Sequence, residues 1–201
     1  MSKKEHWETI YTTKTPQEVS WTQPYPTLSV DLIQQLKLPL SASIIDIGGG
    51  DSLLVDALLE LGYSQITVLD IAESALKKAQ KRLGDKAYKI NWIVSDILDF
   101  LPNQTYDIWH DRAAFHFLTN PAEIDKYTHL LSQNSNHGIV GTFSSEGPLK
   151  CSGIEITQYD EAKIKNTWGK LMTIDQTLTH THITPFDTQQ HFIFACLSKM
   201  D

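Results

Sequence analysis

Short apolar runs alternate with longer stretches that repeat an apolar residue every three or four positions, from residue 43 to about residue 143. The short runs are rich in β-branched residues and predict strands, and the longer stretches predict amphipathic helices. Such alternation is typical of a parallel sheet with right-handed crossovers. The predicted strands are 43–47, 65–70, 89–94, 106–110 and 138–143, and the predicted helices are 52–61, 72–83 and 121–132.

The pattern changes on both sides of this region. A Gly- and Pro-bearing loop, 144–157, is followed by a predicted helix at 160–168. Two β-rich runs, 171–183 and 189–198, then predict a terminal hairpin. The first 40 residues have no place in the strand–helix repeat, and they predict one or two helical turns in 5–11 and a helix near 27–37. We find no linker that would divide the chain.

Three consecutive glycines, Gly48, Gly49 and Gly50, separate the first predicted strand from its helix. Glycine can take φ > 0 and has no Cβ, so a ligand can lie against the backbone of such a turn. The third glycine of the dinucleotide-binding pattern is replaced by Leu53, and Asp46 precedes the turn. A carboxylate there suits a cationic group of a ligand better than a pyrophosphate.

Acids also end the next two predicted strands. Asp70 lies twenty residues beyond Gly50, an interval at which a carboxylate can accept hydrogen bonds from two ribose hydroxyls. Its alternative role is to stabilise the N-terminus of the following helix. Asp96 follows the third strand, where a simple turn residue is the alternative. Because parallel strands end at one sheet edge, we expect these acids to face one ligand crevice together with Asp46.

The Asp-x-Gly-x-Gly pattern at 46–50 resembles motif I of the class I S-adenosylmethionine-dependent methyltransferases. Over roughly 40–198 the resemblance implies an α/β fold: a Rossmann-like seven-stranded methyltransferase sheet with an antiparallel terminal hairpin and a helical N-terminal cap. It implies one domain over 1–201, with the cap at 1–40 and the core at 41–201. S-adenosylmethionine is the implied cofactor, with Asp96 and the next backbone amide meeting its adenine. The implied cofactor-binding residues are Asp46, Gly48, Gly49, Gly50, Asp70, Ile71, Asp96, Ile97, Trp21, Tyr11 and His110.

The opening His-Trp-Glu-x-x-Tyr, the segment Val-Ser-Trp-x-Gln-Pro and the run Trp-His-Asp-Arg-Ala-x-Phe-His-Phe-Leu resemble one bacterial branch of this superfamily. That branch is similar in pattern to the protein-lysine and thiol methyltransferase-like groups. The resemblance implies a reaction class and no acceptor.

The segment 110–118 holds the predicted catalytic residues, since in the family this region faces both cofactor and substrate. His116 is a potential general base, because an imidazole titrates near neutral pH, although a histidine after a strand is often structural. Asp111 and Arg112 contact cofactor or substrate, or they instead pair with each other or order the loop. In the loop 144–153, Lys150 and Cys151 are potential substrate contacts or plain loop residues.

The aromatic residues Trp7, Tyr11 and Trp21 of the N-terminal arm have two possible roles. They can stack over the sulfonium of the cofactor, where cation–π attraction contributes on the order of ~1 kcal/mol, or simply pack the arm onto the core. We expect the arm, 110–118 and 144–153 to close a small, partly aromatic pocket. The histidines His180 and His182 share one strand face without an obvious acid, so a surface or packing role is favoured and no metal site is predicted.

Composition limits the functional classes. The chain has 201 residues, a net charge of −7 and a pI of about 5.6, and this acidity argues against a nucleic-acid partner. Its two cysteines, Cys151 and Cys196, lack zinc-ligand spacing and favour reduced thiols in the cytoplasm. No secretory signal or membrane-length apolar run is expected.

We therefore expect methyl transfer to an unidentified acceptor, with a small molecule favoured. The alternatives are a protein (lysine) methyltransferase and a non-catalytic cofactor-binding subunit of a complex. A nicotinamide-dependent oxidoreductase is disfavoured by Leu53 and Asp46. The Asn-Pro-Pro-Tyr motif of amino methylation on nucleic-acid bases is absent after the fourth strand. The oligomeric state is left open.

Overall fold

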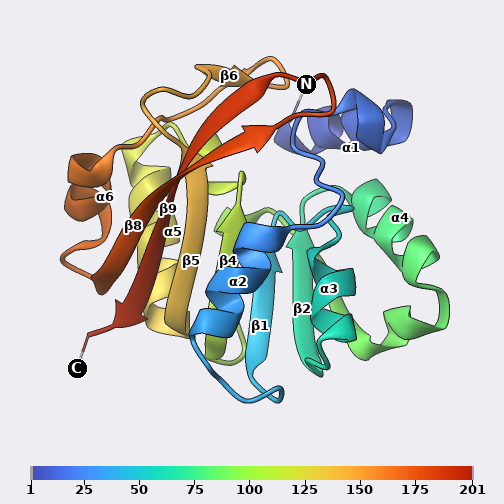
Figure 1. Ribbon diagram of the computed structural model, residues 1–201, viewed down its shortest axis with the longest axis horizontal. Coiled ribbons are helices and arrows are strands. Elements are labelled where there is room, and N and C mark those ends of the chain that lie inside the picture. Colours follow the sequence, from blue (N-terminus) through green and yellow to red (C-terminus); the bar gives the residue numbers. More distant parts are fainter. Residues whose placement is uncertain (1, 201) are drawn as a thin grey trace.

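The computed structural model describes residues 2–200 and contains a seven-stranded sheet of order β3-β2-β1-β4-β5-β9-β8 (Figure 1). The first five strands are parallel, β9 runs antiparallel to β5, and β8 runs antiparallel to β9. The predicted seven-stranded sheet with an antiparallel terminal hairpin is therefore confirmed. The strands are β1 (Ser43–Ile47), β2 (Gln65–Asp70), β3 (Ile90–Val94), β4 (Tyr106–Arg112), β5 (Ser135–Phe143), β8 (Met172–Ile183) and β9 (Gln189–Lys199).

Helices cover both faces of the sheet. Two buried clusters form where α2, α3 and α4 pack on one face and α5 and α6 pack on the other. The helix α1 lies beyond the carboxyl ends of β1 and β2 (Figure 1). The helices are α1 (Lys3–Thr13), α2 (Thr27–Gln35), α3 (Leu54–Glu60), α4 (Glu73–Leu83), α5 (Pro121–Asn134) and α6 (Glu161–Trp168).

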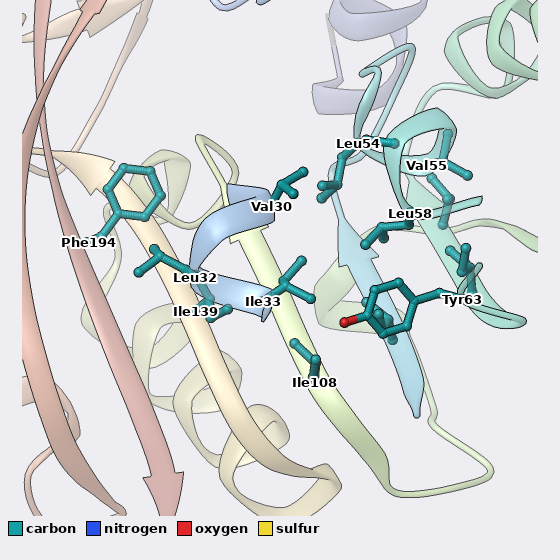
Figure 2. Close-up of a cluster of buried hydrophobic side chains, with 14 of the residues drawn as sticks. Val30, Leu32, Ile33, Leu54, Val55, Leu58, Tyr63, Ile108, Ile139 and Phe194 are labelled. Carbon is teal, nitrogen blue, oxygen red and sulfur yellow. The ribbon is translucent and has the colours of Figure 1, made fainter. Parts of the chain in front are cut away.

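Figure 2 shows how α2 and α3 meet the sheet. Ile33 and Leu58, one from each helix, are fully buried in the same cluster as Ile108 of β4. Full burial of such a side chain contributes about 1.5–3 kcal/mol relative to leaving it in water. The predicted segment near 27–37 is therefore a core helix that fixes the N-terminal part of the chain on the sheet.

The structure departs from the predicted elements in three places. Helix α1 is longer than two turns, because Ser2 and Glu5 form a capping box at its start. Strand β5 begins at Ser135, directly after α5. The loop 144–157 contains a short hairpin of β6 (Lys150–Cys151) and β7 (Ile154–Glu155). Within residues 2–200, no helix has both the length and the apolar character that a bilayer crossing requires.

Candidate active site

A large cavity opens at the carboxyl edge of the parallel strands. Asp46 at β1, Asp70 at β2 and Asp96 after β3 all line it. The prediction that these three acids face one crevice is confirmed, because neighbouring parallel strands end side by side. Of the other predicted cofactor residues, those that also line the cavity are Gly48, Gly49, Ile71, Ile97, Trp21, Tyr11 and His110.

The glycine turn is shaped so that no side chain fits. Gly48 and Gly50 have φ of +63° and +51°, a region that other residues rarely adopt. A Cβ on Gly49 would lie 2.6 Å from Asp46 Oδ2. A Cβ on Gly50 would lie 2.5 Å from Tyr11 Oη, so Gly50 makes room for the N-terminal helix and is not itself a cavity-lining residue. Gly48 and Gly49 therefore present bare backbone to the cavity.

Asp46 is held in place by a buried chain of hydrogen bonds. His110 of β4 lies opposite Asp46 in the sheet register, and its Nδ1 is 2.7 Å from Asp46 Oδ1. The other ring nitrogen, Nε2, is 2.9 Å from Ser29 Oγ on α2. This chain fixes the direction of the carboxylate toward the cavity. The predicted cofactor residue His110 acts on Asp46 from within the same site.

Asp70 is a buried acid with an unusual protonation equilibrium. Its Oδ1 accepts a hydrogen bond of 2.8 Å from the Ala72 amide. Burial, with smaller contributions from the charges on Asp46 and Asp51, raises its pKa to about 7. Hydrogen bonds from the Ala72 and Gly50 amides lower the pKa but do not offset the burial, so further donors would stabilise the charged form. A pair of ribose hydroxyls would supply them, so the site fits the nucleoside part of the predicted cofactor.

Asp96 occupies the other side of the cavity. Its Oδ1 accepts a hydrogen bond of 3.0 Å from the Leu98 amide and caps the short 3₁₀ turn Ile97–Asp99. This bond orients the carboxylate at the cavity wall, next to Ile97. The adenine role remains a prediction.

Aromatic side chains of the N-terminal arm close the cavity from above the strand ends. Trp7 of α1 packs edge-on against Trp21 and against Phe117, with ring centroids 5.8 and 5.0 Å apart. Tyr11 lies 6.2 Å from Trp21. All four residues line the cavity. The packing role is therefore confirmed, and the same rings line the cavity, while stacking over the sulfonium stays a prediction.

Glu8 attaches α1 to the core. Its two carboxylate oxygens accept hydrogen bonds of 2.7 and 3.2 Å from the backbone amides of Glu73 and Ser74. These amides form the first turn of α4, whose own N-cap residue Ala72 offers no side-chain acceptor. Partial burial opposes ionisation of Glu8, but hydrogen bonds from Ser74 and from the two amides outweigh it and the pKa is lowered.

We expect Glu8→Ala to release bound S-adenosylhomocysteine about fivefold faster than the unchanged protein, because it removes a helix cap of about 1 kcal/mol that holds α1 in place. Stopped-flow displacement, followed by tryptophan fluorescence, measures the rate. The exposed Glu60→Ala is the matched control and should leave the rate unchanged. Equal release rates for both variants would show that α1 does not limit ligand exit.

His116 requires a correction, because the structure places it in the core. Its side chain is fully buried, stacks on Phe143 with ring centroids 4.4 Å apart, and does not line the cavity. Neither ring nitrogen has a hydrogen-bond partner among residues 2–200. Burial, aided by the charge of Arg112, lowers the pKa of His116 to about 3. An imidazole that does not line the cavity, and whose lowered pKa makes it a weak base, does not fit the predicted general-base role.

Asp111 is also corrected from a catalytic to a structural residue. It is fully buried and accepts hydrogen bonds from the amides of Ala114 and Phe115 and from the Tyr127 hydroxyl, at 3.0, 3.1 and 2.6 Å. These bonds anchor the turn after β4. Burial raises its pKa to about 6, although the hydrogen bonds oppose that shift. Of the predicted catalytic residues, Arg112 alone lines the cavity.

The predicted residues of the loop after β5 and of the terminal hairpin also differ in whether they line the cavity. Cys151 lines the cavity, but burial raises the pKa of its thiol to about 11, so it is not a ready nucleophile. Lys150 is exposed and does not line the cavity. The Nε2 of His182 on β8 donates to the Ser20 carbonyl at 2.7 Å, so this histidine packs against the arm. Within residues 2–200, no three His, Cys, Asp or Glu side chains converge as metal ligands would.

Several cavity residues escaped the sequence analysis. Phe192 and Gln190 come from β9, which pairs Phe192 with Phe143 at the end of β5. Alternation along β9 would have placed both on one face, but only the sheet order shows that this face reaches the site. Ala113, at the turn after β4, has a φ of +70°, and nothing in its residue type indicates that conformation.

Comparison with known proteins finds partial similarity to methyltransferases. Residues 44–134 match the model of a methyltransferase domain. The mouse EEF1A lysine methyltransferase 2 is 31% identical over 105 residues, which cover 48% of this chain and 43% of that protein. Malonyl-[acyl-carrier protein] O-methyltransferase 1 of Ilyobacter polytropus is 28% identical over 91 residues, 45% of this chain and 33% of that protein. The chain thus spans less than half the length of these two relatives.

Solved structures agree over more of the chain. A SAM-dependent methyltransferase from Anabaena variabilis superposes with a TM-score of 0.72 and 16% identity, covering 100% of this chain and 96% of that one. The structure of Burkholderia thailandensis 1,6-didemethyltoxoflavin-N1-methyltransferase contains bound 1,6-didemethyltoxoflavin and S-adenosylhomocysteine. It superposes with a TM-score of 0.73 and 15% identity, covering 98% of this chain and 87% of that one. The fold is therefore Rossmann-like and of the methyltransferase type.

Proposed function

We propose that this chain binds S-adenosylmethionine and transfers its methyl group to a small-molecule acceptor. The observation that carries the proposal is the convergence of three strand-terminal carboxylates and a bare glycine turn on one cavity under an aromatic arm. Asp70 would accept from the ribose hydroxyls, Asp96 would meet the adenine, and the Gly48–Gly49 backbone with Asp46 would lie against the methionine part. We also propose that the chain belongs to the bacterial branch of the superfamily that its sequence motifs resemble.

The chemistry needs little from the protein beyond positioning. The cofactor supplies an activated methyl group on a sulfonium, and the acceptor supplies the electron pair of the new bond. The arm excludes water from the cavity, and the strand ends fix the direction of approach, which together contribute several kcal/mol through effective concentration. Since His116 and Asp111 lie outside the cavity, the proposal includes no general base from the turn after β4.

A small acceptor is favoured because aromatic residues from three directions close the cavity. Trp7 and Trp21 come from the arm, Phe117 follows β4, and Phe192 comes from β9. A protein side chain would need a free approach across these rings. A lysine side chain remains the second candidate acceptor, because one relative is named as a lysine methyltransferase. A non-catalytic subunit is the remaining alternative.

Calorimetry tests the cofactor. We expect S-adenosylmethionine and S-adenosylhomocysteine to bind with micromolar affinity and NAD to show no binding, because Leu53 and Asp46 do not suit a pyrophosphate. Formation of S-adenosylhomocysteine is then measured against thiols, small acids, amines and proteins. Tight binding of NAD without the other two ligands would contradict the proposal. Turnover with proteins alone would favour the lysine alternative.

A further inference from the structure

Arg112 is a charged residue that lines the cavity and forms no ion pair within residues 2–200. It is the last residue of β4, and its guanidinium carbon lies 5.0 Å from the centre of the Phe192 ring. Its Nη1 donates to the Trp21 carbonyl at 3.1 Å. Its Nη2 is buried and has no hydrogen-bond partner among residues 2–200. No carboxylate of the described chain lies within ion-pair distance of it.

The groups around Arg112 do not neutralise it. The charge of Asp46 favours the guanidinium from beyond ion-pair distance, but that carboxylate is hydrogen-bonded to His110, and the thiol of Cys151 has a raised pKa and stays protonated. Burial lowers the pKa of Arg112 to about 10, which leaves the guanidinium charged at neutral pH. Burying a charge without a partner costs desolvation free energy, and a bound anion that pairs with the guanidinium offsets that cost.

A second unpartnered group lies on the same wall. The Gln190 side chain lines the cavity, and its Oε1 is buried without a hydrogen-bond partner in the described chain. Gln190 and Phe192 are two residues apart on β9, so they share one face of the strand. The wall therefore offers a cation, an amide end and an aromatic ring to the same ligand.

We infer that Arg112 and Gln190 form the acceptor end of the cavity, and that the acceptor is a small organic anion with an apolar body. This inference rests on the proposed function. The free Nη2 donates to the anionic group, with the charge-assisted strength that a guanidinium gives to a carboxylate or thiolate. The Phe192 ring and the tryptophans of the arm pack the apolar part. The Gln190 amide pairs with a polar group beside it.

Matched pairs of probes test the inference in protein saturated with S-adenosylhomocysteine. Phenylacetate and 3-phenylpropionate are compared with their neutral amides, and 2-phenylethanethiol reports on a thiolate, all by calorimetry. We expect at least one of the anionic probes to bind about tenfold more tightly than its neutral counterpart, a preference of the size expected for one charge-assisted hydrogen bond. Acids preferred over amides identify a carboxylate, and a thiol whose binding strengthens as pH rises identifies a thiolate.

Variants assign that preference to Arg112. Arg112→Met should abolish it, and Arg112→Lys should retain part of it through the charge alone, which keeps the test usable if the methionine variant folds poorly. Lys163→Met is the matched control, because Lys163 also lies over an aromatic ring, 4.7 Å from the centre of Tyr159, but outside the cavity. It should leave the preference unchanged.

The possible results distinguish failure of the anion inference from failure of the proposed function. Protein that binds S-adenosylhomocysteine but shows no preference for any anionic probe would overturn this inference and leave the proposed function standing. An anion preference that survives in Arg112→Met would also overturn it. Failure to bind S-adenosylhomocysteine at all would overturn the proposed function itself.

Discussion

Gly48→Val is expected to weaken S-adenosylhomocysteine binding by about 100-fold or more, which corresponds to about 3 kcal/mol. The φ of Gly48 is +63°, and a Cβ there would lie 2.7 Å from the Cβ of Ala114. Strain in this region costs on the order of 1–3 kcal/mol for a β-branched residue, and overpacking adds to it. The turn must move to relieve both, and it moves within the cavity wall. Calorimetry measures the affinity.

Gly84→Val separates obstruction from backbone strain. Gly84 follows α4 with a φ of +55°, and nothing lies within 4 Å of a Cβ placed on it. This variant should lose thermal stability through strain alone and should bind S-adenosylhomocysteine as the unchanged protein does. If the two valine variants lost the same affinity, general destabilisation would account for the effect, and the turn would have no special part in binding.

Asp70→Asn is the second change with a large expected effect. The amide keeps the shape of the side chain but replaces one acceptor by a donor, so two ribose hydroxyls lose their charged partner. We expect a loss of about 1–3 kcal/mol in S-adenosylhomocysteine affinity. Asp175→Asn, an exposed acid on β8, is the control and should bind normally. A folded Asp70→Asn protein with unchanged affinity would place the ribose elsewhere.

The pH dependence gives an independent check on Asp70. Its pKa of about 7 in the folded, ligand-free protein is above the ordinary value of an aspartate. Ligand binding requires the ionised form, so affinity should fall by about tenfold from pH 8 to pH 6. Stability of the ligand-free protein follows the opposite sign, because protonation favours the fold. This stabilisation is present at low pH and is lost as pH rises toward 7. In Asp70→Asn the pH dependence of affinity should vanish, and that of stability should weaken to the part contributed by other buried acids such as Asp111.

The sequence predicted the placement of the strand-end acids and the glycine turn because these features are local. A strand, an acid and a glycine turn are read from consecutive residues, and parallel strands bring their ends together whatever lies between them. The positions of Asp46, Asp70 and Asp96 at one edge follow from this rule alone. The aromatic arm was also predicted, because its tryptophans had no place in the strand–helix repeat.

The acceptor side was harder because it depends on turns and on distant strands. The residues from His110 to Phe117 alternate in direction only until β4 ends at Arg112. The positive φ of Ala113 then redirects the chain, so His116 turns into the core and Phe117 toward the cavity. No residue type announces that change. Phe192 reaches the site through an antiparallel pairing with β5, which the order of residues does not reveal.

The attachment of α1 to α4 gives the molecule a built-in reporter. The amides of Glu73 and Ser74 are protected by the Glu8 carboxylate, which belongs to another helix, and not by the hydrogen bonds of α4 itself. Hydrogen exchange of these two amides with solvent therefore requires the Glu8 hydrogen bonds to break, which detaches α1 from α4. The amides in the interior of α4 exchange only when that helix unfolds. Exchange at Glu73 and Ser74 thus reports the free energy of detaching α1 from α4, without any ligand or label.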